Sequence, residues 1–356
     1  MHCGAGWKSS DKESKLMTNN RQEANPTKIA NLAEGETGRV IALNIPADLI
    51  DKNAEHVEYI RCEAEQLPLA DNAADTIIIA GANYVVSLRE LFRVLKMRGR
   101  LLSMDVSADD AAAFEQKLAA AGFICRRVAK NSRVMTLEAE KPFDYTAIIF
   151  GDKQADAHET DPISILNAWM DHPDVFMHGP EHHVLDGAAL LVALDRWYSQ
   201  HPEEAQKVHS WRREQAARLN ADEPDEENHE VPVMNIRDAI SELIERAGGY
   251  PGGACGYLGV CGAAVSAGTA FSIFSVTSPF SDITWSEASA LTGSILTRLS
   301  TSPGPRCCKR NAYMALQTAG DFLKQHYSID LKTNDSVRCR YFDKNEECVF
   351  TDCVFF

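Results

Sequence analysis

Apolar residues recur along the first part of the chain in the short runs and spacings of alternating strands and helices. Residues 39–44 and 76–80 contain continuous apolar runs of the kind that form buried strands in a parallel sheet. Residues 88–95 place apolar side chains at helical spacing, and residues 100–105 follow as another strand. This repeated strand–helix–strand order predicts an α/β fold with a Rossmann-like, doubly wound sheet.

From about residue 162 the apolar pattern changes to the spacing of helices. Helices are expected over residues 162–170, 180–199, 202–219, 236–247, about 260 onward, 286–299 and 306–326. The tail, 337–356, is rich in aromatic and β-branched residues around a turn, which predicts a short C-terminal hairpin. A polar linker at 151–161 then separates a Rossmann-like domain, 1–150, from a mainly helical domain, 161–356.

Composition and charge narrow the classes of function. The 356 residues are 45% hydrophobic and 24% charged, which is typical of a globular protein and excludes a disordered or coiled-coil chain. A formal net charge of −15 argues against nucleic acid as a partner. A small molecule is the expected partner.

We expect neither a secretory signal nor a membrane span from this sequence. Its first twenty residues lack the apolar core of a secretory signal, so a cytoplasmic location is expected. Between Arg246 and Asp282 lie 35 uncharged residues, but eight glycines and two prolines among them favour a buried small-residue helix over a membrane span. The expectation is no membrane contact, and no oligomeric state follows from the sequence.

Three blocks of the first domain, GRVIALNIPADLI, VEYIRCEAEQLPLADNAADTIIIA and LRELFRVLKMRGRLLSMDV, resemble the class I methyltransferases that use S-adenosylmethionine. The resemblance implies that Asn44 stands where the family has an acidic ribose contact at the end of its second strand. It also implies that Glu63 and Ala64 lie in the block that contacts adenine. Asn44 is therefore a departure from the family, whereas the adenine block matches it.

The resemblance further assigns residues 74–78 to the family's fourth strand and a glycine-rich turn to the cofactor. The glycines available for that turn are Gly4 and Gly6, which lie 38 residues or more before Asn44. The family's spacing is about 20 residues, because backbone amides at that turn meet the ligand. The resemblance thus predicts weak binding of S-adenosylmethionine by a degenerate site.

Cysteine is distributed unevenly, since seven of the ten cysteines lie at or after position 255. In a chain without an export signal, such a concentration indicates metal ligation or thiol chemistry before disulfides. Zinc and iron–sulfur clusters are the centres that thiolates favour. The candidate ligands are Cys255, Cys261, Cys307, Cys308, Cys339, Cys348 and Cys353. Redox-active thiols and buried inert cysteines are the alternatives.

Local sequence suggests how these thiols are arranged. Cys255 and Cys261 belong to a glycine-rich loop and the helix start after it, and Cys307 and Cys308 lie at a cationic helix start. The two pairs are expected to converge on one centre. The helix dipole and neighbouring cations are expected to lower the pKa of the two adjacent thiols. The three tail cysteines are expected to stabilise the tail by joining a thiolate site.

The motifs HGPEHH at 178–183, PGGACGYLGVCG at 251–262 and GPRCCKRN at 304–311 resemble a domain of unknown function, DUF5714. That family brings no established activity. The candidate catalytic residues of the first motif are His178, Glu181 and His182, which lie at a helix start. His182 is one helical turn before Asp186.

Two functions compete on these observations. The first is an S-adenosylmethionine-dependent methyltransferase whose cysteine-rich domain binds a small, soft acceptor such as a thiol, arsenic or selenium species. The second is a metal- or iron–sulfur-binding protein whose methyltransferase-like domain is a non-catalytic scaffold. A binding or regulatory module is the remaining alternative.

Overall fold

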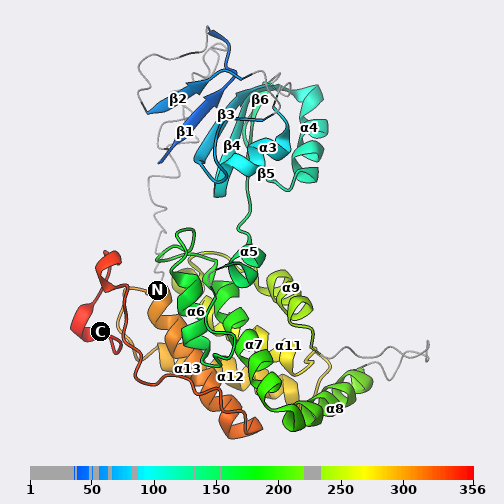
Figure 1. Cartoon of the computed structure of the whole chain (residues 1–356), viewed down its shortest axis with the longest axis vertical. Helices are drawn as coiled ribbons and strands as arrows, with labels where there is room; N and C mark the ends of the chain where they lie inside the picture. Colours follow the sequence, from blue (N-terminus) through cyan, green and yellow to red (C-terminus); the bar gives the residue numbers. More distant parts are fainter. Residues whose placement is uncertain are drawn as a thin grey trace, which may run out of the picture. The chain divides into compact units, whose positions relative to one another are not determined.

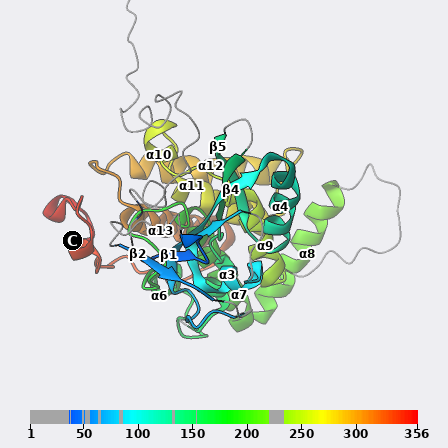
Figure 2. The same cartoon turned by 90° about the horizontal axis from the view of Figure 1, so that it is seen from above.

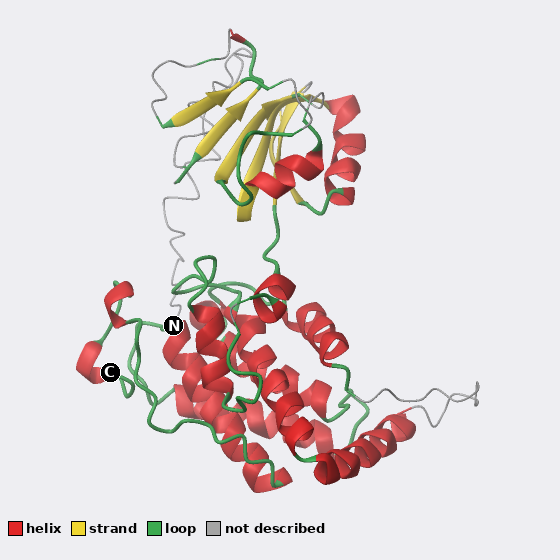
Figure 3. Cartoon of the chain, in the orientation of Figure 1, coloured by secondary structure: helices red, strands yellow, loops and turns green. Residues whose placement is uncertain are grey.

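The computed structural model of the chain divides into two compact units, which meet in sequence between Phe143 and Asp144. It describes residues 36, 38–47, 50, 56–62, 66–81, 86–130, 134–152, 154–219 and 234–356. The strands described all belong to the first unit, and the second consists of helices and loops (Figure 3). The predicted domain limit at residue 150 falls after the short helix α5 (Tyr145–Phe150), which packs against helix α7 (His182–Gln200) of the second unit.

The first unit is built on a six-stranded mixed sheet in the order β2-β1-β3-β4-β6-β5 (Figure 1). Its strands are β1 (Val40–Leu43), β2 (Val57–Ile60), β3 (Ala74–Ala80), β4 (Leu95–Ser107), β5 (Ile124–Lys130) and β6 (Val134–Glu140). The first four strands in this order are parallel, whereas β6 runs antiparallel to both β4 and β5. The predicted Rossmann-like α/β fold is confirmed.

Alternation along each strand produces two apolar faces. Ile41 and Ile77 belong to a core that also includes residues of helices α3 (Leu88–Val94) and α4 (Ala108–Ala120). Ile78 lies in a second cluster of side chains from β1, β2, β3 and β4. Each helix begins at a serine whose hydroxyl accepts a backbone N–H of the first turn. Among the described residues, both helices of this unit therefore cover the same face.

The strands matched to the family's second and fourth strands are direct neighbours. Val40 pairs with Thr76 and Ala42 with Ile78, so no other strand lies between β1 and β3. In the doubly wound order 3-2-1-4, the first strand stands between the second and the fourth. The strand that would carry the family's glycine-rich turn therefore has no place in this sheet, because β1 and β3 pair directly with each other.

The second unit is a bundle of helices around α7 (Figures 1 and 2). Its helices are α5 (Tyr145–Phe150), α6 (Pro162–Met170), α7 (His182–Gln200), α8 (Pro202–Leu219), α9 (Ile236–Ala247), α10 (Ala254–Tyr257), α11 (Gly262–Phe274), α12 (Ile283–Leu299) and α13 (Cys308–Tyr327). Thirteen residues of α7 are buried because α6, α9, α11 and α13 surround it. The mainly helical second domain is confirmed. None of the helices among the described residues combines the length and the apolar character needed to cross a membrane.

The predicted C-terminal hairpin is wrong. The tail instead contains two short 3-10 helices, η2 (Phe342–Lys344) and η3 (Phe350–Asp352), on the opposite side of the second unit from α8 (Figures 1 and 2). One of its aromatic rings packs against α13, since Phe355 meets Tyr313 at a centroid distance of 5.3 Å, while Phe342 and Phe350 pack against Phe356 within the tail. Aromatic residues favour strands because they suit a half-buried surface, and here a helix supplies that surface.

Candidate functional site

The switch point of the sheet, where ligands bind in open α/β folds, is the carboxyl edge of β1 and β3. Asn44 and Gly81 follow these strands, and both have positive φ values, 51° and 69°. The Asn44 side chain donates to the carbonyl of Cys62 and accepts its N–H, each at 2.8 Å. Asn44 thus ties the end of β2 to the end of β1 with both ends of its amide.

The other predicted cofactor contacts, Gly4, Gly6, Glu63 and Ala64, lie outside the described residues. The loop that follows the adenine block is described from residue 66, and helix α3 holds it. Glu90, buried at 7% exposure, accepts the N–H of Leu67 at 2.7 Å. Arg93 donates to the carboxylate of Glu90 at 2.8 Å through Nε and to the carbonyl of Leu69 at 2.9 Å. These contacts fix the path from the adenine block to β3.

A cavity of about 360 Å³ lies in the second unit where several helices begin. We call it the thiol–imidazole pocket, after the cysteines and histidines in its wall. Its lining includes His178, His182, His183, Asp186, Cys255, Cys261, Arg306, Cys308 and Asn311. The three motifs noted in the sequence therefore meet here, although more than 120 residues separate the first from the last.

The three candidate catalytic residues occupy different positions. His178 lines the pocket, where its Nδ1 accepts the N–H of Cys308 at 3.5 Å and its Nε2 lies 3.0 Å from Asn345 Oδ1. Glu181 is fully buried and accepts the N–H of Phe176 at 2.8 Å. It is not part of the pocket lining given above. Glu181 thus supports the turn before α7.

His182 belongs to a buried polar chain that sequence reasoning identified only in part. Its Nδ1 lies 3.3 Å from Asp186 Oδ1, and its Nε2 lies 3.1 Å from Lys309 Nζ. Burial lowers the pKa of His182 to about 3, and the Lys309 cation adds to the effect. His182 is therefore neutral, and its Nε2 accepts from Lys309. The four-residue spacing from His182 was the signal for Asp186, whereas Lys309 gave none.

His183 has a different environment from its neighbour. Its Nδ1 donates to the carbonyl of Tyr250 at 2.9 Å, which leaves Nε2 as the acceptor nitrogen. A Cβ atom at Gly262 would overlap the His183 ring, so only glycine permits this contact at the start of α11. A hydrogen bond from one ring nitrogen to a carbonyl is the usual support of a histidine that binds a ligand through the other.

Three of the seven candidate thiols line this pocket, namely Cys255, Cys261 and Cys308. Cys261 Sγ accepts from Asn311 Nδ2 at 3.3 Å. Burial raises the pKa of Cys261, and it raises that of Cys308 to about 12. The pKa of Cys307 is also raised by burial, so the expected lowering at positions 307 and 308 is wrong. Desolvation of the thiolate outweighs the helix dipole and the nearby cations there.

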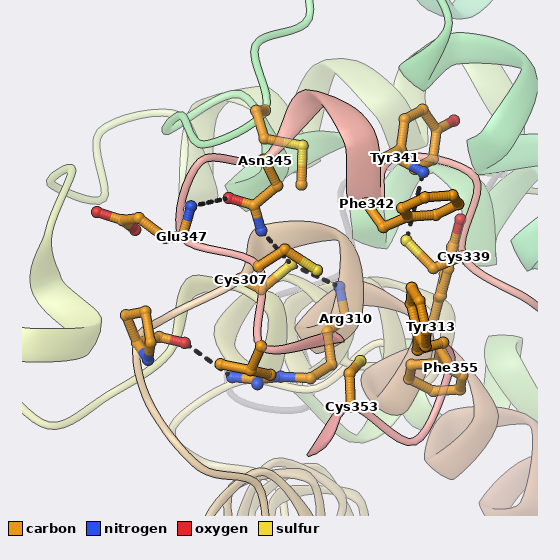
Figure 4. Close-up of a pocket in the computed structure, with 15 residues that line it drawn as sticks. Cys307, Arg310, Tyr313, Cys339, Tyr341, Phe342, Asn345, Glu347, Cys353 and Phe355 are labelled. Atoms are coloured by element: carbon orange, nitrogen blue, oxygen red, sulfur yellow. Dashed lines mark hydrogen bonds between the residues drawn. The ribbon is translucent and has the colours of Figure 1, made fainter. Parts of the chain in front are cut away.

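The other four candidate thiols form a second group, which we call the tail cluster: Cys307, Cys339, Cys348 and Cys353. They line a cavity of about 20 Å³ between the start of α13 and the tail. In Figure 4 the sulfur atoms of Cys307, Cys339 and Cys353 turn toward the same space. Burial raises the pKa of Cys339, and the other three thiols of the tail cluster add to the rise.

Backbone N–H groups donate to three sulfurs of the tail cluster, and Figure 4 shows the contacts at Cys307 and Cys339. Arg310 donates to Cys307 at 3.5 Å, Tyr341 to Cys339 at 3.4 Å and Phe350 to Cys348 at 3.4 Å. In the last two cases the donor lies two residues after the cysteine. At Cys307 and Cys339 these hydrogen bonds offset part of the rise in pKa that burial causes.

The predicted convergence of the cysteines is only partly observed. Cys307 and Cys308 are neighbours in sequence, but Cys307 caps α13 and joins the tail cluster while Cys308 faces the thiol–imidazole pocket. The prediction that one centre collects Cys307 with Cys255 and Cys261 is therefore wrong. Within the described part of the chain, no three His, Cys, Asp or Glu side chains are positioned to hold a metal ion.

Comparison with known families identifies the second unit. Residues 152–218 and 227–356 match a family of unknown function, DUF5714, which is more than half of the chain. The protein therefore belongs to this family. Both the thiol–imidazole pocket and the tail cluster lie within the matched residues.

The first unit contains a methyltransferase-like domain, since residues 25–103 match a methyltransferase domain family. Over 87 residues, 20% of this chain, the sequence is 39% identical to the ubiquinone/menaquinone biosynthesis C-methyltransferase UbiE of Klebsiella pneumoniae, and equally to that of Salmonella arizonae. The chain spans about a third of these relatives, 35% of their length.

Several solved structures that resemble part of the chain are described as methyltransferases. An S-adenosylmethionine-dependent methyltransferase of Aquifex aeolicus is 22% identical, with 32% of this chain and 75% of that chain covered, at a TM-score of 0.26. A putative methyltransferase of Bacillus halodurans is 17% identical, with 38% and 100% covered, at a TM-score of 0.24.

Proposed function

We propose that the protein is an S-adenosylmethionine-dependent methyltransferase that acts on a small, soft acceptor held in the thiol–imidazole pocket. The observation that carries the proposal is the match of the first unit to a methyltransferase domain in a chain whose second unit lines a cavity with three thiols. Thiol and thiolate groups prefer soft partners, which favours a thiol, arsenic or selenium species over a hard oxygen nucleophile.

In this function the residues of the pocket need only bind and orient the acceptor. When bound, the cofactor would supply the methyl group from its sulfonium, with S-adenosylhomocysteine as the leaving group, and a soft nucleophile would take that methyl group without an external oxidant. The residues of the pocket would bind and orient the acceptor: Cys261 and Cys308 by contact with a soft atom, and His183 through the free acceptor Nε2. Orientation of this kind is a large part of the catalysis of a bimolecular transfer.

The test uses the full chain, purified without oxygen, with isotope-labelled S-adenosylmethionine. Calorimetry measures cofactor binding, and mass spectrometry follows methylated products from small thiols, arsenite and selenide. We expect weak cofactor binding and methylation of one soft acceptor class, lost in Cys261→Ser and Cys308→Ser. Cys125→Ser is the matched control, because Cys125 is a half-buried cysteine of β5 outside the pocket. Absence of both cofactor heat and product would reject the proposal.

A second candidate function is metal binding by the tail cluster, with the methyltransferase-like unit as a scaffold. The four thiols around one small cavity favour it, as does the direct pairing of β1 with β3, which closes the place of the family's glycine-bearing strand. A zinc ion or an iron–sulfur cluster would be held by Cys307, Cys339, Cys348 and Cys353. Metal–sulfur bonds of about 2.3 Å require the four sulfurs to move together on binding.

Metal content and tail protection test this candidate together. We expect anaerobically purified protein to contain zinc or iron, and a chelator or Cys348→Ser to speed protease cleavage after residue 337, because the bound metal holds the tail on α13. Cys255→Ser, outside the tail cluster, should leave the digestion pattern unchanged. Identical tail cleavage with and without chelator, in protein shown to contain metal, would contradict the candidate.

A further inference from the structure

One oxygen in the wall of the thiol–imidazole pocket has no partner. Asp186 is fully buried, and its Oδ1 contacts His182 Nδ1 at 3.3 Å. Its second oxygen, Oδ2, is buried without a hydrogen-bond partner. Buried polar atoms are nearly always hydrogen-bonded, because leaving one unpaired costs free energy. Asp186 lines the thiol–imidazole pocket, so a ligand bound there is the partner that we consider for this oxygen.

The buried chain behind Asp186 decides which oxygen can carry a proton. Lys309 Nζ donates to the carbonyl of Phe176 at 2.9 Å and approaches His182 Nε2 at 3.1 Å. Since His182 accepts at Nε2, its Nδ1–H donates to Asp186 Oδ1. A carboxyl proton then belongs on Oδ2. Burial raises the pKa of Asp186 well above its ordinary value, which favours this protonated form.

The charges around the pocket favour a negative ligand. Three helices of 19, 13 and 20 residues, α7, α11 and α13, begin at the pocket wall with His182, Gly262 and Cys308. Helix N-termini carry a partial positive charge, and Arg306 adds a full one in the same wall. The volume of about 360 Å³ admits a molecule much larger than one water, whose share of liquid volume is about 30 Å³.

We propose that the thiol–imidazole pocket binds a small oxyanion group, to which Asp186 donates a hydrogen bond through Oδ2. Arg306 and the helix N-termini balance the charge of the bound group. This inference rests on the proposed function for the identity of the acceptor. It deepens that function by naming the anionic group through which the pocket would hold the acceptor. Binding is measured without methyl transfer, so the two proposals fail separately.

The test is calorimetric titration of the full chain, reduced and free of oxygen, with sulfite, sulfate, phosphate and acetate. We expect at least one of the four to bind at millimolar concentration or below. Asp186→Asn is the decisive variant, because its amide keeps the acceptor for His182 and presents N–H where the carboxyl O–H stood. Its affinity should stay within about threefold of the wild type, whereas Asp186→Leu should weaken binding by about tenfold or more.

Two further variants keep the test decisive if Asp186→Leu fails to fold. Arg306→Gln should weaken anion binding by about threefold to tenfold. The affinity of this variant should not depend more steeply on salt concentration than that of the wild type. Asp195→Asn is the matched control on the same helix, outside the pocket, and should bind as the wild type does. The inference is overturned if none of the four anions binds, if Asp186→Leu binds unchanged, or if Asp186→Asn loses affinity as much as the leucine variant.

Discussion

An amide in place of a carboxylate changes what position 44 does. The family resemblance reads Asn44 as a weakened ribose contact, but its side chain closes two hydrogen bonds of 2.8 Å with the backbone of Cys62. Asn44 also takes a φ of 51°, a conformation that asparagine tolerates better than most residues. Asn44 therefore joins the ends of β1 and β2. A sequence pattern alone cannot distinguish this structural role from ligand binding.

The variant Asn44→Asp is expected to destabilise the first unit. A carboxylate accepts the N–H of Cys62 but cannot donate to its carbonyl, so one half-buried hydrogen bond is lost and a negative charge faces the carbonyl oxygen. We expect a loss of about 1–2 kcal/mol in urea unfolding. Asn72→Asp is the control, because Asn72 only accepts from Lys141 Nζ, at 2.9 Å, and a carboxylate does so better. Equal stability of the two variants would contradict this account.

Glu90 makes the stability of the first unit depend on pH. The hydrogen bond from Arg93 holds the pKa of the Glu90 carboxyl below its ordinary value, against the effect of burial. A lowered carboxyl pKa contributes stability above the ordinary value, and that stability disappears as the pH falls through the lowered pKa. Glu90→Gln should therefore cost about 1–3 kcal/mol at neutral pH and flatten the acid limb of the stability profile.

The control for Glu90 is a surface carboxylate of the same unit. Glu58 pairs with Arg39 at 2.8 Å, but their side chains are 47% and 41% exposed. Solvent screens such a pair, so Glu58→Gln should change stability by less than about 1 kcal/mol. The measurement is urea unfolding at several pH values. An acid limb that keeps its slope in Glu90→Gln would contradict the assignment.

At the scale of elements, close approach between helices explains the small residues of the second unit. Helix α7 crosses α11 where Gly187 donates its N–H to Ser266 Oγ at 2.7 Å. A Cβ atom at Gly187 would lie 2.5 Å from the carbonyl oxygen of Ser266, closer than side chains tolerate. Of the 35 uncharged residues between Arg246 and Asp282, thirteen form α11, a buried helix that packs against α7.

Gly187→Ala tests this crossing through the sign of its effect. Alanine normally stabilises a helix relative to glycine by about 1 kcal/mol. At Gly187 the backbone of α11 stands in the way, so we expect a loss of about 1–3 kcal/mol in thermal or urea unfolding. Gly293→Ala on α12 has no atom within 4 Å of the new methyl group and should stabilise instead. The same sign for both variants would refute the explanation.

Two elements show why sequence periodicity succeeds and fails. The helices α6, α8 and α9 have the predicted limits, because proline or asparagine caps and long apolar periods define them locally. The prediction for the tail failed because aromatic and β-branched residues around a turn are typical of a hairpin, whereas Phe355 of the tail packs against Tyr313 of α13. The division of Cys307 from Cys308 was equally hidden, since it depends on the direction in which α13 enters the unit rather than on spacing.

At the scale of the whole molecule, each of the two units has a hydrophobic core of its own. The first unit has its own sheet core, and in the second unit α6, α9, α11 and α13 surround α7. Strand–helix alternation and helical periods were readable from the sequence because each follows local rules. The neighbours of β1 and the residues that share the thiol–imidazole pocket were not readable, because chain segments far apart in the sequence supply them.

This division predicts that the second unit folds alone. Residues from Asp144 onward keep α5, all the helices around α7, the thiol–imidazole pocket and the tail cluster, so a chain of 144–356 should retain a complete core. We expect a single cooperative unfolding transition, and the same loss of stability for Gly187→Ala as in the full chain, because no residue of the first unit forms that crossing. A chain of 152–356, cut at the family match, lacks α5 and should be less stable. Circular dichroism during urea unfolding measures both; a 144–356 chain without a cooperative transition would mean that its core depends on the first unit.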